Sequence, residues 1–485
     1  MLKQSFRLDS NFTPTKDQQN SINELVCGID KYKHQTLKGI TGSGKTFVLG
    51  NIISNKENPA IVLAPNKVLA YQLYNELVEM FPDNFVGYYV SNYDIYIPPY
   101  FHNILQKKVE GTIVVNQENK DLRYAVKDFL EYSDKAILVC SSTILFPTFE
   151  DSLPDLIVKH KSYIIRRLNE EMVKQGKDFR DRDQNIEADR LENHIDHTTN
   201  MLLPPDSEYY NTDVIAILGE KLGDFYLTDY FPKSKPNLFI DESHLTLLQL
   251  KALPSANKAR LTKLVDKGYY LSNVIKDNVL DFDGLKDRVN TITYMSATPS
   301  KFELENSEYI SELLTRPNNI VDPKLTLKEG DYFGSNVMIS DIKNIVKKGE
   351  TVFINCLSRK SVNDIHILLS YNNIDSEVIH FKIKQNKRKE ILRDLRSGKI
   401  NVIVGINMLR EGIDVKQCSL VIVEQASRNN FLRTKSCLIQ VSGRAARNIN
   451  GEVFMCCNHI SSSLEGAIEE IEYRREKQLS LIGSI

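Results

Sequence analysis

Long apolar runs are missing from this 485-residue sequence, and that absence excludes the membrane-spanning class of proteins. No stretch approaches the ~20 consecutive apolar residues that a transmembrane helix needs. The first residues, MLKQSFRLDSNFTPTK, also lack the apolar core of a signal peptide. We therefore expect no membrane association and a cytoplasmic location.

Cysteine is scarce, with seven residues in the chain. The number is odd and includes the adjacent pair Cys456 and Cys457, so the cysteines do not form a disulfide framework. No C-x-x-C pair occurs, which argues against a zinc site built from cysteine thiolates. A reducing compartment agrees with both observations.

An excess of either charge is also missing, because 62 Lys and Arg residues face 63 Asp and Glu residues. A histone-like DNA-binding chain would be far more basic, so any nucleic-acid surface must be a local groove. The 41% hydrophobic and 26% charged content is that of an ordinary globular protein. At this length, two or more domains are expected.

Short β-branched runs recur along the chain, each followed by a turn and a helix-like stretch. Near-continuous apolar runs of this length are typical of buried parallel strands, because helices cover both faces of such a sheet. Their alternation with helical patterns predicts a doubly wound α/β fold. The expected strands lie in AIVLAPNK (60–67), KAILVCSST (135–143), NLFIDESH (237–244), TITYMSAT (291–298), TVFINCLS (351–358) and NVIVGINM (401–408).

The expected strands fall into two groups on either side of TRPNNIVDPK (315–324), whose Pro and Asn residues are turn signals. We therefore expect two doubly wound lobes, over residues 1–318 and 319–485, joined by this linker. Residues 150–215 differ in composition, because charged residues are dense there and Ile, Leu and Met are interspersed among them. A solvated helical arm or hairpin is the favoured interpretation there.

The segment from Gly39 to Thr46 fits the phosphate-loop pattern G-x-x-x-x-G-K-[ST] and precedes an apolar helical stretch. Glycines let backbone N–H groups surround phosphate oxygens, and the helix N-terminus adds positive potential. Lys45 would reach the β- and γ-phosphates of ATP, and the Thr46 hydroxyl would ligate Mg²⁺. A chance glycine-rich turn is the alternative, and the further motifs below argue against it. The expected nucleotide-binding residues are Gly39, Thr41, Gly42, Ser43, Gly44, Lys45 and Thr46.

Two carboxylates, Asp241 and Glu242, follow the expected strand NLFI. Such a position lies at the ligand-binding edge of an open α/β sheet. Asp241 would hold Mg²⁺ through its water shell, and Glu242 would polarise the attacking water. An isolated acidic pair is usually a solvated turn, but a buried strand before it and a phosphate loop elsewhere favour the catalytic role.

Two further patterns complete a helicase-like order. Ser296-Ala297-Thr298 resembles the helicase element that couples the ATP state to DNA grip. In the second half, Arg444 and Arg447 stand three residues apart, which would place both on one helix face. They suit arginine fingers that reach a phosphate site on the other lobe. Surface arginines are the alternative, and Gln440 before them, giving Q-x-x-G-R-x-x-R, argues against it.

Taken in order, these motifs resemble a superfamily-2 helicase core, and longer stretches resemble the UvrB family of the excinuclease ABC system. The resemblance implies that Gln18 reads adenine, that Asp414 and Gln440 belong to the nucleotide site, and that Lys45, Glu242, Arg444 and Arg447 act in catalysis. It implies that both lobes are RecA-like, and it covers them apart from roughly residues 145–215. The matching stretches are KDQQNSI (16–22), ITGSGKTF (40–47), LAPNKVLAYQLYNEL (63–77), TDYFP (228–232), IDESHLT (240–246), YMSATPSKFELE (294–305), GINMLREGIDV (405–415) and FLRTKSCLIQVSGRAARN (431–448).

The family's DNA-threading β-hairpin has a counterpart at about residues 91–116. Of its four tyrosines Tyr93 and Tyr96 remain, while Lys108 stands in place of a tip phenylalanine. Aromatic faces stack on bases of any sequence, and Lys107 and Lys108 could contact phosphate. Ile95 and Ile97 fit a second interpretation equally well, an apolar hairpin buried against the lobe.

Two of the family's partner-binding parts have no recognisable counterpart. A β-rich domain that docks UvrA is expected after Thr143, where only the charged segment is found, and a C-terminal helical hairpin that engages UvrC is not seen before Ile485. We therefore expect an ATP- and Mg²⁺-dependent motor on DNA, with UvrA and UvrC contacts in doubt. Excision repair, an orphan DNA translocase serving phage defence, and an ATP-gated DNA clamp remain alternative roles.

Overall fold

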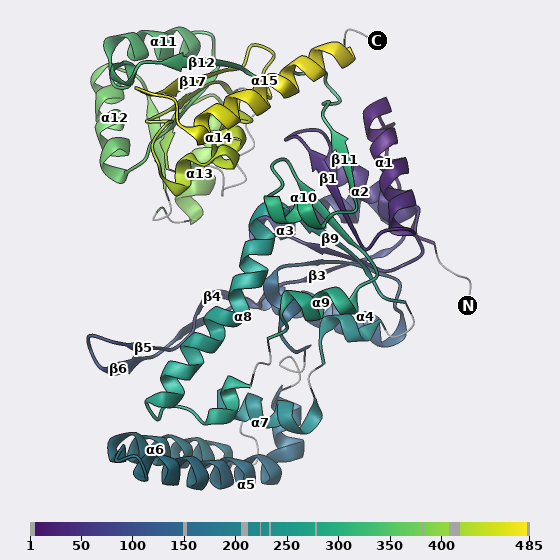
Figure 1. Ribbon diagram of the computed structural model, residues 1–485, viewed down its shortest axis with the longest axis vertical. Coiled ribbons are helices and arrows are strands. Elements are labelled where there is room, and N and C mark those ends of the chain that lie inside the picture. The colour runs from purple at the N-terminus through teal and green to yellow at the C-terminus, as the bar shows by residue number, and fades with distance from the viewer. Residues whose placement is uncertain are drawn as a thin grey trace.

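The computed structural model describes residues 5–148, 153–204, 212–223, 225–231, 234–276, 279–380, 383, 385–406 and 418–482. Two parallel sheets, each covered by helices, form two lobes, and a ribbon and a helical arm extend from the first (Figure 1). Among the described residues, no helix has both the length and the apolarity to cross a bilayer.

The first sheet has seven strands in the order β11-β1-β10-β9-β2-β8-β3, and all neighbouring strands pair in parallel. Successive strand residues face opposite sides, so Val62 packs with α1, α2 and α3 while Ile61 and Leu63 pack with α4, α8 and α9. The strands are β1 (His34–Gly39), β2 (Ala60–Leu63), β3 (Phe85–Tyr89), β8 (Ala136–Cys140), β9 (Asn237–Asp241), β10 (Ile292–Ser296) and β11 (Tyr309–Leu313). The helices are α1 (Lys16–Ile29), α2 (Lys45–Ser54), α3 (Lys67–Met80), α4 (Gln117–Tyr132), α8 (Ser243–Asp266), α9 (Phe282–Arg288) and the short α10 (Lys301–Asn306).

The second sheet has six parallel strands in the order β12-β17-β16-β13-β15-β14. One face packs against α11 and α12, and the other against α13, α14 and α15. The strands are β12 (Lys324–Lys328), β13 (Thr351–Asn355), β14 (Ser376–Ile379), β15 (Val402–Gly405), β16 (Cys418–Val423) and β17 (Glu452–Cys456). The helices are α11 (Asn336–Val346), α12 (Arg359–Tyr371), α13 (Gln385–Arg396), α14 (Lys435–Ser442) and α15 (Ser462–Ile482).

The expected fold class is confirmed. All six apolar runs form strands at the expected places, and each is buried along nearly its whole length because helices cover both faces. Residues 314–323 connect the two sheets and nearly coincide with the stretch that carries the turn signals, residues 315–324. The helix α15 returns from the second lobe towards this connection (Figure 1).

Two insertions leave the first lobe between its strands. A ribbon follows β3 and consists of the antiparallel pairs β4 (Tyr93–Ile97) with β7 (Thr112–Val115) and β5 (Tyr100–His102) with β6 (Lys107–Val109). The charged region forms the paired helices α5 (Leu153–Arg180) and α6 (Asn185–Leu202), followed by α7 (Thr212–Leu222). This helical arm has an apolar core of its own, which includes Ile164, Leu191 and Ile217. The long helix α8 runs from the sheet towards the arm (Figure 1).

Candidate nucleotide site and nucleic-acid interface

The phosphate loop connects β1 to α2 at the carboxyl edge of the first sheet. Gly42 and Gly44 adopt φ of 81° and 84°, a left-handed region that glycine enters without a steric penalty. Ser43 Oγ donates to the Ile40 carbonyl at 2.8 Å, which closes the turn. Lys45 begins α2, and its Nζ donates to the Gly39 carbonyl at 3.2 Å. The loop therefore directs the N-terminus of a helix and a lysine towards one space, as phosphate binding requires.

Gln18 ties the loop to α1. It takes part in a capping box with Thr15, whose backbone N–H donates to the Gln18 Oε1 at 3.0 Å. The other end of the amide, Nε2, donates to the Ser43 carbonyl at 2.8 Å. A Cβ at Gly44 would lie 2.6 Å from that Nε2. Both ends of the amide contact the chain itself, so Gln18 holds the loop's shape, and the contact with adenine that the family resemblance implies stays a prediction.

Asp241 and Glu242 lie at the same edge of the sheet, where β9 ends and α8 begins. Glu242 adopts φ of 42°, a strained conformation that clusters at functional sites. Burial, with the adjacent Glu242 charge adding to it, raises the pKa of Asp241 to about 7, and Lys45 opposes the shift. A cation would offset this carboxylate repulsion, so Asp241 and the Thr46 hydroxyl fit Mg²⁺, which prefers oxygen ligands.

A chain of hydrogen bonds crosses from the first lobe to the second. His244 Nδ1 lies 2.8 Å from Ser296 Oγ, and its Nε2 accepts from Gln440 Nε2 at 2.5 Å. Gln440 Nε2 also donates to Thr298 Oγ1 at 3.1 Å. Burial lowers the pKa of His244, and the neutral ring with its proton on Nδ1 is the tautomer that fits these partners. The acidic motif, the Ser-Ala-Thr motif and Gln440 thus form one network.

The two candidate arginine fingers do not share a helix face as expected. Helix α14 ends at Ser442, and residues 443–447 form turns. Past Ser442 the backbone N–H groups of Arg444 and Ala445 donate to carbonyls three residues back, so the α-helical pattern does not continue to the arginines. Arg444 lies close enough to Glu242 to feel its charge, while burial lowers the arginine's pKa. Burial also lowers the pKa of Arg447, and the positive charge of Arg316 adds to the shift.

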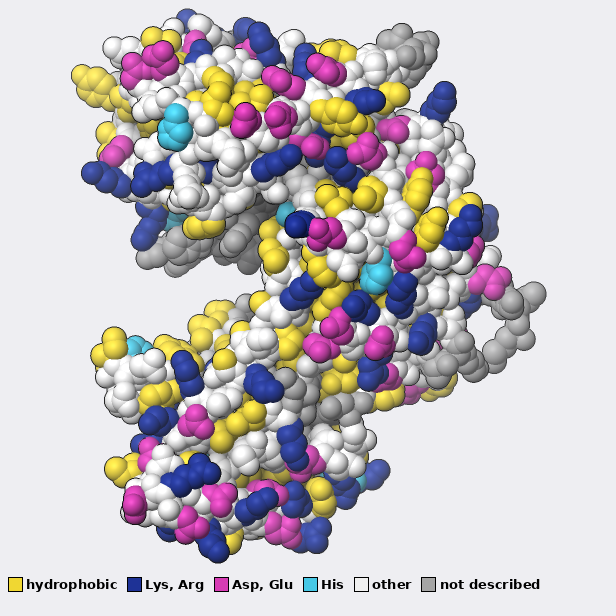
Figure 2. Space-filling model, in the orientation of Figure 1, with side chains coloured by type: hydrophobic (Ala, Val, Ile, Leu, Met, Phe, Trp, Pro, Cys, Tyr) yellow, Lys and Arg dark blue, Asp and Glu magenta, His cyan; other side chains and the backbone are white. Residues whose placement is uncertain are grey.

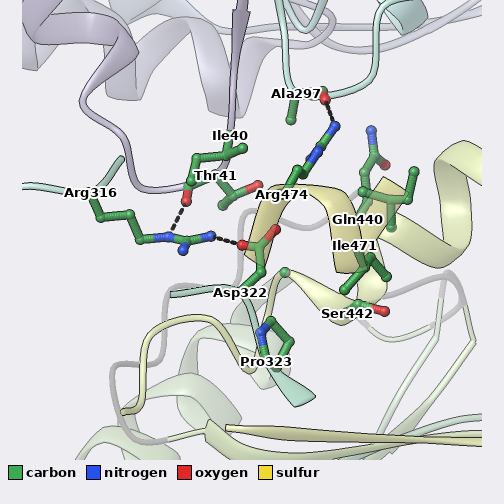
Figure 3. Close-up of a pocket in the computed structure, with 12 residues that line it drawn as sticks. Ile40, Thr41, Ala297, Arg316, Asp322, Pro323, Gln440, Ser442, Ile471 and Arg474 are labelled. Carbon is green, nitrogen blue, oxygen red and sulfur yellow. Dashed lines mark hydrogen bonds and ion pairs between the residues drawn. The ribbon is translucent and has the colours of Figure 1, made fainter. Parts of the chain in front are cut away.

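A small pocket lies where the lobes meet beside the phosphate loop (Figure 3). Ile40 and Thr41 line it from the loop, and Gln440 and Gly443 line it from the second lobe. Its further lining residues Arg316, Asp322 and Arg474 were missed by the sequence interpretation. Arg316 and Asp322 lie in the segment identified as a linker, and each directly precedes a proline. These Arg-Pro and Asp-Pro pairs are the sequence feature that could have pointed to them.

The ribbon is exposed along the strands nearest the lobe. Tyr93 and Tyr96 stack with their ring centroids 5.5 Å apart, and Tyr96 is 55% exposed. Ile95 and Ile97 are 46% and 50% exposed, so the interpretation of a hairpin buried against the lobe is wrong. Figure 2 shows apolar side chains over the ribbon, at the border of a wide notch with the second lobe on its other side.

The two lysines of the hairpin have different surroundings. Lys107 is exposed, whereas Lys108 pairs with Glu110 at 3.3 Å and lies over the ring of Tyr270 at 5.1 Å. The Lys108 backbone N–H also donates to Tyr269 Oη at 3.1 Å, which fixes the distal ribbon to the region after α8. Lys107 is therefore the better candidate for a phosphate contact. Asp414, the remaining expected nucleotide residue, lies outside the described residues.

Two family models match the chain. The model described as "Type III restriction enzyme, res subunit" matches residues 11–166. The model described as "Helicase conserved C-terminal domain" matches residues 337–449. These ranges contain the phosphate loop and the segment with Gln440, Arg444 and Arg447.

Whole proteins also match over nearly the full chain. UvrABC system protein B of Caldanaerobacter subterraneus subsp. tengcongensis is 31% identical over 578 aligned positions, which cover 98% of this chain and 86% of that protein. UvrABC system protein B of Staphylococcus epidermidis is 30% identical over 575 positions, with the same coverage. The 578 positions exceed the 485 residues of the chain by 93, so at least that many positions of the first relative have no counterpart here.

Solved structures match more distantly. RecG bound to a three-way DNA junction has a TM-score of 0.49 at 14% identity, covering 97% of this chain and 48% of that one. Dbp5 of S. cerevisiae bound to RNA and ADP BeF3 has a TM-score of 0.46 at 14% identity, covering 95% and 88% of the two chains.

Proposed function

This chain belongs to the UvrB family of superfamily-2 helicases, and on that premise we propose that it uses ATP to grip, locally open or move along DNA in nucleotide excision repair. Its helicase domains make it an ATP hydrolase. What is proposed is the work to which hydrolysis is coupled. The observation that carries the proposal is the hydrogen bond from Gln440 to His244, because it joins the acidic motif of one lobe to the other lobe.

In the proposed nucleotide site, the loop amides and Lys45 bind the phosphates of ATP. Thr46 and Asp241 would hold Mg²⁺, which would supply positive charge against the phosphate oxygens. Glu242 orients the attacking water and accepts its proton. The order of the motifs and their common sheet edge support these roles.

The second lobe contributes Arg444 and Arg447 to the γ-phosphate, with Asp414 and Gln440 completing the site. We assign residues 1–318 and 319–485 to the two lobes. Two arginines brought from one lobe to the phosphates on the other make lobe closure depend on the nucleotide, and such a two-state closure can move DNA held across both lobes.

DNA is the proposed partner, held by the ribbon. Tyr93 and Tyr96 offer aromatic faces for base stacking, and Lys107 offers a positive charge for a phosphate. The exposure of this apolar surface supports the proposal, because large exposed apolar patches mark binding sites. Single-stranded or locally opened DNA is the form whose bases can reach these rings.

A second role outside excision repair is favoured by one observation. At least 93 positions of the first relative lack a counterpart, and the family's UvrA-docking domain is the part expected to be missing. A motor without that domain would serve another DNA pathway, as a translocase or as an ATP-gated clamp.

The test begins with ATP hydrolysis by the purified chain, with and without single-stranded DNA. Lys45→Ala should abolish hydrolysis, while Lys56→Ala, a charge removed just beyond the other end of α2, should leave it unchanged. If the unaltered protein does not hydrolyse ATP, or if Lys45→Ala hydrolyses it at an unchanged rate, the proposed ATPase site is refuted. Processive displacement of a long duplex would exclude the clamp, and capture of UvrA with preference for damaged DNA would support repair.

A further inference from the structure

Arg316 connects the phosphate loop to the segment between the lobes. Its guanidinium donates from Nε to the Thr41 carbonyl at 2.9 Å and from Nη2 to Asp322 Oδ1 at 2.5 Å (Figure 3). From Nη1 it also donates to the Ile320 carbonyl at 2.8 Å. Arg316 is 4% exposed and Asp322 is 5% exposed. The planar, forked guanidinium meets three acceptors at once, which the single ammonium of lysine could not do in the same geometry.

The same segment is held from the second lobe by α15. Gln478 Nε2 donates to the Leu314 carbonyl at 3.0 Å, and its Oε1 accepts from the Asp322 backbone N–H at 2.6 Å. Arg475 Nη1 donates to the Asp322 carbonyl at 2.5 Å. Asp322 therefore lies between Arg316 on one side and α15 on the other, with its side chain and its backbone both engaged.

Helix α15 also contacts the motifs around the nucleotide site. Arg474 Nη2 donates to the Ala297 carbonyl, in the Ser-Ala-Thr motif, at 2.7 Å. Glu470 pairs with Lys38, the residue before Gly39, at 3.2 Å. A displacement of the phosphate loop relative to the second lobe must therefore change contacts on this one helix.

The charges around Arg316 make this connection sensitive to phosphate. Arg447 of the second lobe lies close enough to Arg316 that the two positive charges oppose each other. A phosphate group bound by the loop beside Thr41 would place negative charge near both guanidinium groups and favour their approach.

We propose that Arg316 is a positioning residue for ATP hydrolysis, which ties Thr41 in the phosphate loop to Asp322 so that nucleotide binding is transmitted through the connecting segment to α15 and the second lobe. This inference rests on the ATP-driven lobe closure proposed above. Arg316 acts through the loop and the segment. The nucleotide remains held by Lys45 and the loop amides.

The test compares Arg316→Lys with the double variant Arg316→Met/Asp322→Leu. The first keeps the charge but loses the fork. The second removes both partners of the buried pair, so no unpaired charge remains if the single variant fails to fold. Arg428→Lys, an exposed arginine on the second lobe, is the matched control. Each variant is assayed for kcat and KM of ATP with and without single-stranded DNA, for affinity to a fluorescent non-hydrolysable ATP analogue with Mg²⁺, and for amide hydrogen exchange over residues 314–323.

Both variants should bind the analogue within about threefold of the unaltered protein, while kcat in the presence of DNA falls about tenfold or more. The analogue should slow exchange over residues 314–323 in the unaltered protein and in the control, but not in the variants. Melting temperatures without nucleotide should stay close to that of the unaltered protein for at least one variant.

Two results would overturn the inference. Either unaltered kcat and exchange in Arg316→Lys, or a loss of analogue affinity as large as the loss of kcat, would show that Arg316 does not act by positioning. If the unaltered protein hydrolyses no ATP, the proposed motor and the role of Arg316 in hydrolysis both fail. The dependence of exchange on Arg316 still decides whether it transmits nucleotide binding to the connecting segment.

Discussion

Gln440 and His244 meet across the boundary between the two lobes, with the amide nitrogen of Gln440 2.5 Å from Nε2 of His244. The same amide reaches Thr298 at 3.1 Å, and the other ring nitrogen of His244 reaches Ser296 at 2.8 Å. One side chain of the second lobe therefore contacts two motifs of the first. Any change in lobe position must break or remake this contact.

Removing the amide should uncouple hydrolysis from DNA. We expect Gln440→Leu to lower DNA-stimulated kcat by about ten- to a hundredfold, because His244 and Thr298 lose their shared donor. Measurement of kcat for Gln440→Leu, His244→Leu and the double variant forms a cycle. Residues that act as one unit should give a double variant no worse than the poorer single variant. Losses that multiply would show that the two residues act independently.

A side chain at Gly44 should damage nucleotide binding. In Gly44→Ala the alanine must adopt the left-handed conformation of Gly44, which costs about 1–2 kcal/mol. Its Cβ would also lie 2.6 Å from Gln18 Nε2. We expect the KM of ATP to rise about tenfold or more, measured by steady-state kinetics. Gly349→Ala is the control, since it has φ of 73° with no atom within 4 Å. It should lose similar stability in thermal unfolding yet keep its KM, and an equal rise in KM in both would contradict the role of the Gln18 contact.

The ribbon should bind single-stranded DNA through Tyr96. Tyr96→Ala should weaken binding by about 1–3 kcal/mol, the value of one base stacked on an aromatic ring. Fluorescence anisotropy with a labelled oligonucleotide of mixed sequence measures this loss. Tyr132→Ala removes a tyrosine that is 87% exposed on α4 and should bind normally. If Tyr96→Ala and Tyr132→Ala bind the oligonucleotide equally well, the ribbon is not part of the DNA interface.

The hairpin lysines should differ in their salt effects. Lys107→Ala should reduce the dependence of log affinity on log salt by about 0.7, the value for one phosphate contact on a single strand. Lys108→Ala should change that slope less, because Lys108 already pairs with Glu110 and lies over Tyr270. Titrations at several salt concentrations decide between them, and a larger change for Lys108 would reverse the assignment.

The sequence predicted the strands and the phosphate loop well because both depend on local patterns. Residues 60–63 and 136–140 are apolar throughout, which is the pattern of a strand buried on both faces. Gly39 to Thr46 needs its glycines for the turn itself. Such features are decided by neighbours in the chain.

The remaining parts of the site depend on contacts between distant residues. The helix face expected for Arg444 and Arg447 was wrong because α14 ends at Ser442 and turns follow it. Arg316 and Gln478 meet at one segment from positions 162 residues apart, and no local pattern announces such a meeting. The different surroundings of Lys107 and Lys108 likewise depend on Glu110 and on Tyr270, which lies far along the chain.

The position of β1 in the first sheet has a consequence for synthesis. The strand that carries the phosphate loop pairs with β10 and β11, whose residues 292–296 and 309–313 come more than 250 positions later. Pairing over such separations is slow, since a long loop must close before the contacts form. A chain leaving the ribosome therefore holds its phosphate loop on an unpaired strand until most of the first lobe has been made. Nucleotide binding is acquired late, as a property of the finished lobe.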